Sequence, residues 1–222
     1  MAKDDLQAPP VPRPPARRGA CYPLKRNDGF MASRKILIID GHPDPDPARF
    51  VHALAKAYAD GATGHEVRML KLAELDVPIL HSSSDWMKGK PCAAIAAAQA
   101  DIAWAEHLVI LYPLWLGDVP ALLKAFLEQV MRPGFALQYA EHGLPKKLLK
   151  GRTARLVVTM GMPALFYRLV YGAHSVKSLE RNILRFVGIR PVGRTIVGAV
   201  EASAERRREW LEEMADLGAK GE

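Results

Sequence analysis

At 222 residues the chain is long enough for one α/β domain with an extension, and too short for two full domains joined by a linker. Hydrophobic residues make up 49% of it and charged residues 25%, which is the composition of a soluble globular domain. The longest strongly apolar run, 108–116, is far below the roughly 20 residues that a membrane helix requires, so we expect no membrane span.

The formal charge of +7 does not by itself indicate a nucleic-acid partner. Residues 1–30 contain six basic and three acidic side chains, so +3 of that charge lies there. The remaining excess shows no interleaving of basic and aromatic residues of the kind that single-stranded nucleic acid requires. A phosphate-bearing cofactor explains it equally well, and we expect no nucleic-acid partner.

Residues 1–30 hold six prolines and almost no periodic hydrophobicity, which predicts a disordered Pro/Arg-rich tail before a domain over 31–222. The tail has no apolar secretory core, and Met31 would be a sensible natural start. Only two cysteines, Cys21 and Cys92, are present. We therefore expect no disulfide framework, no metal site and a reducing, cytoplasmic location.

From residue 35 onward, short β-branched runs alternate with helical periodicity, which is typical of a parallel sheet covered on both faces. Residues 35–40 predict a buried strand. Residues 47–60 predict a helix, with Pro47 in its first turn, and 66–70 a second strand. The segment 72–90 has no clear period and is expected to be a long excursion.

The second half continues the alternation. The expected elements are a helix over 93–106, a strand over 107–112, a helix over 121–131, a strand over 154–160, a helix over 176–186, a strand over 195–200 and a helix over 204–217. Five strands joined by helices, with right-handed crossovers, predict an α/β, flavodoxin-like three-layer sandwich with a five-stranded parallel sheet. In such a sheet the ligand lies beyond the carboxyl ends of the strands, so the loops there are the candidate site.

The loop after the first strand, 41–50, contains three prolines and leads into a helix N-terminus. Exposed N–H groups and the positive end of the helix dipole favour an anion at such a place. Arg49 would add a bidentate phosphate donor, and His42 a further hydrogen bond. The competing interpretation is a proline-stiffened connector with a solvated Arg49, since the loop carries neither a Rossmann nor a P-loop pattern.

The loop after the third strand, 112–121, is fixed by two prolines and a glycine while it presents Trp115 between two leucines. A flat, mostly apolar ring system edged with polar atoms is a natural ligand for such a loop. The alternative is that Trp115 plugs the end of the sheet.

The loop after the fourth strand places Gly161 near the same edge, followed by Tyr167 and His174. A phenol and an imidazole near a redox cofactor can stabilise charge or relay a proton as a hydride arrives. The alternative is that both are packing residues with a satisfied polar tip.

Together these loops resemble the flavodoxin-like NAD(P)H dehydrogenase (quinone) family over about residues 35–200. The most specific matches are Leu111-Tyr112-Pro113-Leu114-Trp115, Val119-Pro120-Ala121-Leu122-Leu123-Lys124 and Pro133-Gly134-Phe135-Ala136. The resemblance implies cofactor-binding residues in three groups and two catalytic residues. They are His42, Arg49 and Phe50 around the phosphate and ribityl chain, Pro113, Leu114, Trp115, Leu116 and Gly117 along the isoalloxazine, Thr159 and Gly161 at its other edge, and Tyr167 and His174 as catalytic residues.

The resemblance also implies an activity. Members bind FMN or FAD and pass hydride from NAD(P)H through the flavin to a quinone-type acceptor, and they are commonly dimers with the site at the subunit interface. We therefore expect a homodimeric NAD(P)H:quinone oxidoreductase, with FMN favoured because no segment matches the adenine-binding region of larger members. The alternative is an ancillary regulatory flavoprotein of a potassium-efflux system.

Overall fold

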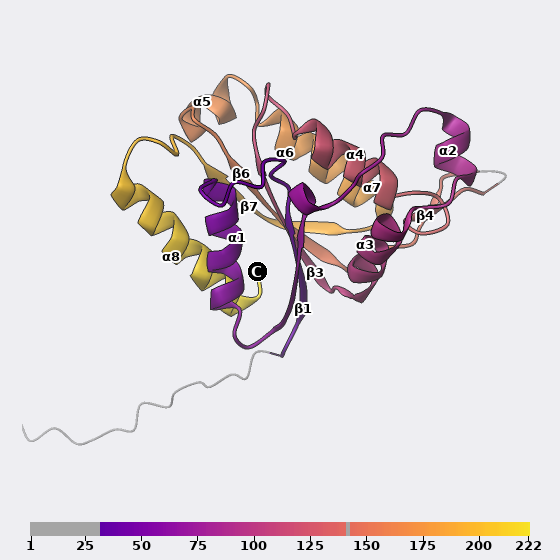
Figure 1. Cartoon of the computed structure of the whole chain (residues 1–222), viewed down its shortest axis with the longest axis horizontal. Coiled ribbons are helices and arrows are strands. Elements are labelled where there is room, and N and C mark those ends of the chain that lie inside the picture. Colours follow the sequence, from indigo (N-terminus) through magenta and orange to yellow (C-terminus); the bar gives the residue numbers. More distant parts are fainter. Residues whose placement is uncertain (1–31, 141–142) are drawn as a thin grey trace, which may run out of the picture. The chain divides into compact units, whose positions relative to one another are not determined.

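The computed structural model describes residues 32–140 and 143–222 (Figure 1). The disordered tail that the sequence predicts over 1–30 lies outside these residues. Within them, the expected domain is built on one five-stranded parallel sheet in the order β2-β1-β3-β6-β7. Its strands are β1 (Lys35–Asp40), β2 (Glu66–Lys71), β3 (His107–Pro113), β6 (Thr153–Thr159) and β7 (Arg190–Val197).

Helices cover both faces of this sheet, as Figure 1 shows. One face carries α1 (Phe50–Gly61) and α8 (Ala204–Lys220). The helices on the other face are α3 (Ala93–Trp104), α4 (Ala121–Val130) and a continuous run made of α6 (His174–Ser178), the π-helix η2 (Leu179–Leu184) and α7 (Arg185–Val187). The predicted three-layer α/β sandwich is confirmed.

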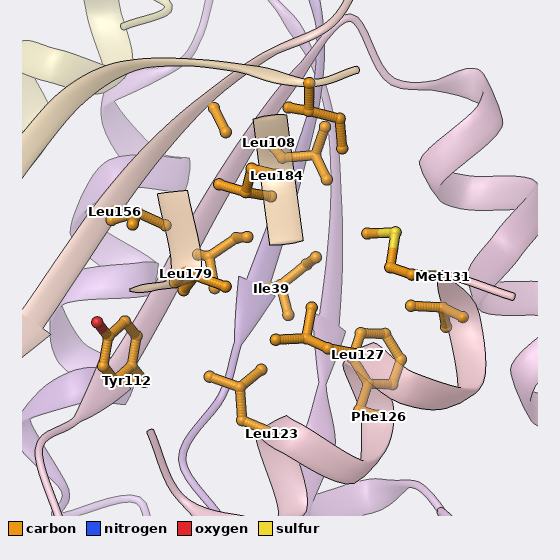
Figure 2. Close-up of a cluster of buried hydrophobic side chains, with 14 of the residues drawn as sticks. Ile39, Leu108, Tyr112, Leu123, Phe126, Leu127, Met131, Leu156, Leu179 and Leu184 are labelled. Carbon is orange, nitrogen blue, oxygen red and sulfur yellow. The ribbon is translucent and has the colours of Figure 1, made fainter. Parts of the chain in front are cut away.

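Strand periodicity explains how one sheet serves two cores. Along β1, Ile36 and Ile38 face α1 and α8, whereas Leu37 and Ile39 face the opposite layer, because successive side chains of a strand point to opposite faces. Figure 2 shows the second core, in which Leu108 and Leu156 of the strands meet residues of α4 and η2. Both cores are almost fully inaccessible to solvent, so the sheet is a rigid base for the loops at its edge.

Several short elements escaped the sequence prediction. The excursion over 72–90 contains a 3₁₀ turn, η1 (Leu72–Glu74), and a short helix, α2 (Ser83–Lys88), which the Ser82 hydroxyl caps by accepting the Asp85 N–H. Three further elements are α5 (Ala164–Leu169) and the antiparallel pair β4 (Leu137–Gln138) and β5 (Lys146–Lys147).

Predicted boundaries were wrong at α1, at β7 and at the end of α8, which runs to Lys220 instead of 217. Helix α1 begins at Phe50, so Pro47 lies in the preceding loop rather than in a first helical turn. Strand β7 runs over Arg190–Val197 instead of 195–200. Its first half lies at the edge of the sheet and pairs only with β6. This part was not predicted as strand because Pro191 and Gly193 interrupt the run of β-branched residues.

Candidate functional site

The loops after β1, β3 and β6 meet at the carboxyl edge of the sheet. Backbone hydrogen bonds connect them: the Gly41 N–H donates to the Leu111 carbonyl at 2.7 Å, and the Leu114 N–H to the Thr159 carbonyl at 2.8 Å. The ring of His42 contacts that of Trp115 edge-on, with centroids 5.9 Å apart. We call the loop residues 41–49, 114–120 and 160–163 the rim.

The first rim loop is held by side chains that accept N–H groups two residues further on. His42 Nδ1 accepts from Asp44 at 3.0 Å, Asp44 Oδ1 from Asp46 at 2.9 Å and Asp46 Oδ1 from Ala48 at 3.0 Å. The three prolines that alternate with these residues have no N–H to offer. In the described chain the free amide donors of this segment are therefore those of Phe50 and Val51, at the start of α1.

Arg49, expected to face a phosphate, is directed at carboxylates of its own loop. Its Nε donates to Asp44 Oδ2 at 2.7 Å, and its guanidinium also lies 3.3 Å from Asp46. The side chain is half exposed, so these ion pairs are weakened by solvent. In this arrangement Arg49 stiffens the loop, and it would have to leave Asp44 to reach an anion at the helix N-terminus.

A buried carboxylate beneath the loop organises its position. Asp40, at the end of β1, accepts the His42 N–H at 3.2 Å through Oδ1 and contacts His52 Nδ1 at 2.5 Å through Oδ2. The other ring nitrogen of His52 lies 2.9 Å from the Asp44 carbonyl oxygen. Both partners of His52 are acceptors, so the geometry fits an imidazolium that donates twice.

The pKa values of the two histidines in this cluster are shifted in opposite directions. Burial and the neighbouring charge of His52 lower the pKa of His42. For His52, burial also opposes the charge, but the hydrogen bonds to Asp40 and Asp44 outweigh it and raise the pKa. His42 is thus neutral, and because its Nδ1 accepts a backbone N–H, the ring proton sits on Nε2 as a donor.

The second rim loop is a tight turn that holds Trp115 partly in solvent. Trp115 and Asp118 exchange both of their backbone hydrogen bonds at 3.0 Å, and Leu116 and Gly117 between them have φ values of 49° and 82°. A leucine with positive φ is uncommon and strained. Trp115 is 48% exposed and Leu116 fully exposed, so the tryptophan is not a simple plug of the sheet.

The third rim loop follows the buried Thr159, whose carbonyl receives the Leu114 N–H. The next two described amides without a protein acceptor belong to Gly161 and Met162. A Cβ added at Gly161 would meet no atom within 4 Å, so this position borders open space. Pro113, at the end of β3, is buried, and Leu114 is partly buried beside it.

Residues 34–217 match the protein family described as having the flavodoxin-like fold. The chain belongs to this flavodoxin-like family. The match spans most of the chain and agrees with the sheet order β2-β1-β3-β6-β7. The resemblance inferred from the rim-loop motifs is confirmed at the level of the family.

Relatives of this flavodoxin-like chain are named as redox enzymes. An FMN-dependent NADH:quinone oxidoreductase 2 of Listeria innocua is 32% identical over 111 residues, which cover 47% of this chain and 49% of the relative. An FMN-dependent NADH:quinone oxidoreductase of Nitratidesulfovibrio vulgaris is 26% identical over 80% of this chain and 95% of the relative. For the first of these, the chain spans about half the length of the curated relative it matches.

Among solved structures, an FMN-dependent NADH-azoreductase from Bacillus anthracis in complex with FMN superposes with a TM-score of 0.66. The match covers 84% of this chain and 98% of that one, at 19% sequence identity. At this identity the likeness concerns the fold.

The two residues expected to be catalytic lie in different environments of the flavodoxin-like domain. Tyr167 in α5 is fully buried and stacks on Tyr171, with its hydroxyl near Ser175 and Val176 but not in a well-formed hydrogen bond. Burial raises its pKa, which keeps the phenol protonated at neutral pH. His174, the first residue of α6, is exposed and lines a surface cleft.

Sequence reasoning missed Asp40 and His52, which fix the first rim loop. Asp40 ends an apolar strand, and such a position offers only a weak signal of a buried carboxylate. His52 is separated from it by twelve residues and carries no motif. Among the described residues no cluster of three His, Cys, Asp or Glu side chains suits a metal ion, and no described helix has the length and apolarity to cross a bilayer.

Proposed function

We propose that this chain binds FMN at the rim and is an NADH:quinone-type oxidoreductase. The observation that carries the proposal is the junction of three loops at one edge of the sheet, through the contact between His42 and Trp115 and the hydrogen bond between Leu114 and Thr159. The names of the relatives favour the same activity and favour FMN over FAD. The ancillary role in potassium efflux gains no such support.

The donor set at the rim suits a flavin phosphate on one side. The free N–H groups of Phe50 and Val51 lie at the start of a 12-residue helix that has no acidic residue in its first turn. His42 supplies a further N–H from Nε2. We propose that Arg49 exchanges Asp44 for the phosphate, as a bidentate donor can do at modest cost from an exposed ion pair.

The other two loops suit a flat ring with polar edges. Gly161 and Met162 on one loop, and Leu116 and Gly117 on the other, carry backbone N–H groups with no acceptor in the described chain. Such amides can meet ring heteroatoms. We propose that Pro113, Leu114 and the half-exposed Trp115 flank the ring and that Thr159 supports the opposite loop.

The chemistry that FMN supplies when bound is two-electron transfer between a dihydronicotinamide and a quinone-type acceptor. The chain positions the partners and excludes water. We propose His174, exposed at the start of α6, as a proton donor toward the acceptor. Tyr167 is proposed to act through its buried phenol, as a neutral hydrogen-bond donor behind the rim.

A homodimer is part of the proposal because α5 exposes a contiguous apolar stretch. Leu165, Leu169 and Val170 are each more than 60% exposed, next to the loop that carries Gly161. Exposed apolar patches of this kind commonly mark interfaces. A cytoplasmic location is proposed from the exposed free thiol of Cys92, since reducing compartments preserve such thiols.

The test is made on the purified protein. We expect a yellow preparation with flavin absorbance, FMN as the flavin released on denaturation, and NADH oxidation that depends on added quinone. Light scattering on the same sample should give the mass of a dimer. A colourless protein that takes up no flavin on reconstitution would contradict the redox proposal, and a monomer mass would contradict the dimer alone.

A further inference from the structure

A large cleft lies beside the rim, along the run of helices α6, η2 and α7. It has a volume of about 840 Å³ and is open to solvent. Its basic lining residues are His174, Lys177, Arg181 and Arg185 from the helical run and Arg194 from β7. This volume is in the range of pockets that hold whole small-molecule ligands.

The cations from the helical run share one side of it. Lys177, Arg181 and Arg185 follow one another at intervals of four residues, so they project in similar directions. All three side chains are exposed, and none has an ion-pair partner among residues 32–140 and 143–222. Three positive charges at neighbouring positions repel one another, and an anion between them would relieve that repulsion.

One of the two carboxylates that line the cleft is already engaged. Glu180 is buried, and both of its oxygens accept from the Arg194 guanidinium in a bidentate pair. Hydrogen bonding to Glu180 raises the pKa of Arg194, and the bidentate contact balances the charge of that guanidinium within the pair. The other carboxylate, Asp118 of the second rim loop, is exposed, and Lys177, Arg181 and Arg185 outnumber it, so the cleft keeps a net positive charge.

A row of exposed basic residues on a helix is often only a solvated face. Two features distinguish this one. The row borders a concave space, and its middle section, Leu179–Leu184, is a π-helix, a rare conformation that is frequently found at functional sites.

The cleft also continues into the rim. Asp118 and Ser178 line both the cleft and a smaller, mainly apolar groove that contains Trp115, Leu116 and Ile183. A ligand lying along both would place an aromatic head beside Trp115 and an anionic part among the cations. A dinucleotide has this construction.

We propose that the cleft binds the phosphate groups of the reducing nicotinamide dinucleotide. The inference rests on the proposed function for the identity of the donor, and on the cleft itself for its charge. Lys177, Arg181 and Arg185 would hold the pyrophosphate, and the adjoining groove would direct the nicotinamide end toward the rim.

The kinetic test compares the wild-type protein with the double variant Arg181→Gln/Arg185→Gln. Removing two phosphate donors should raise the KM for NADH about tenfold while kcat at saturating NADH and the KM for the quinone stay unchanged. The wild-type KM should also rise with salt. The matched control is Arg208→Gln on α8, on the opposite face of the sheet, which removes an exposed arginine and should leave all three constants unchanged.

A binding test separates this inference from the redox proposal. ADP-ribose carries the pyrophosphate without nicotinamide, so its binding to the purified protein, measured by calorimetry, requires no turnover. We expect the double variant to bind it about tenfold more weakly than the wild type or Arg208→Gln. Equal affinities in all three proteins would overturn the cleft assignment even if the protein is yellow and active. Weakened binding would support it even if no flavin is found.

Discussion

At the scale of single residues, His52 links the end of β1, the first rim loop and the start of α1. Asp40 and the Asp44 carbonyl accept hydrogen bonds from the two ring N–H groups of His52. The ring centroid of His42 lies 5.3 Å from that of His52, and the charge of Lys71 adds a weaker repulsion. The attraction exceeds the repulsion because Asp40 is buried and in direct contact. His52 should therefore carry its charge in the folded state at pH values where it is neutral in the unfolded chain.

This geometry predicts a pH-dependent stability. The unfolded His52 has a pKa of about 6.5. Because the folded value is higher, the stabilisation is complete below about pH 6.5 and is lost as pH rises through the folded pKa. His52→Gln should cost about 2 kcal/mol of unfolding free energy at pH 6 and clearly less at pH 9.

Urea denaturation of both proteins at the two pH values measures this difference. Other titrating groups are common to the two proteins and largely cancel in the comparison. An equal cost at pH 6 and pH 9 would show that His52 does not carry a proton-linked hydrogen bond.

Arg49 shows what a sequence pattern leaves undetermined at this scale. The sequence placed it in the first turn of a helix over 47–60, whereas the structure has it as the residue that precedes α1. Its partner was not predictable. The sequence alone does not say whether Arg49 pairs with Asp44 and Asp46 or with a bound anion. The two carboxylates reach the guanidinium because side chains of the loop accept backbone N–H groups and so form its turns. The anion role of Arg49 stays a prediction.

At the scale of elements, α1 and α8 pack unusually closely through two glycines. A Cβ placed on Gly218 of α8 would lie 2.1 Å from the Tyr58 carbonyl oxygen, and one placed on Gly61 would lie 2.1 Å from that of Ala215. Neither position tolerates a side chain without separating the helices. This packing holds the helix whose N-terminus faces the rim.

Gly218→Ala should therefore destabilise the fold although alanine favours helices. The helical preference gains about 1 kcal/mol, whereas overpacking a close backbone contact costs about 1–3 kcal/mol. We expect a net loss, seen as a fall of a few degrees, about 2–5 °C, in the thermal midpoint. Gly64→Ala is the control, because a Cβ there meets nothing within 4 Å. An unchanged or raised midpoint for Gly218→Ala would contradict the close packing.

Strong periodicity made the principal elements predictable. Strand β1 and the starts of α4 and α8 lie where the apolar pattern placed them, since each buries a face against the sheet. Helix α3 begins where its alanine-rich sequence predicted a helix from propensity. The apolar pattern did not predict the elements whose side chains are only partly buried. Helix α5 exposes most of its apolar residues, and the first half of β7 is an exposed edge beneath the Arg155 guanidinium. The two-residue strands β4 and β5 are too short to carry any period.

At the scale of the whole described domain, the cationic cleft adjoins the rim, because Asp118 of the second rim loop also lines the cleft. The sequence predicted the rim, because the carboxyl ends of parallel strands meet at one edge and the loops there carry distinctive residues. It did not predict the cleft. Its cations come from the helical run and from β7, and only the folded chain shows that they border one concave space.

The central claim is that three loops form one seat for a flat flavin ring, with Trp115 beside it. Titration of FMN into flavin-depleted protein, followed by the change in flavin fluorescence, tests it most directly. The wild type should bind FMN, Trp115→Ala should bind about tenfold more weakly through lost ring contact, and Trp86→Ala, in α2 outside the rim, should match the wild type. An FMN affinity that is absent in the wild type, or equal in the wild type and Trp115→Ala, would contradict the account.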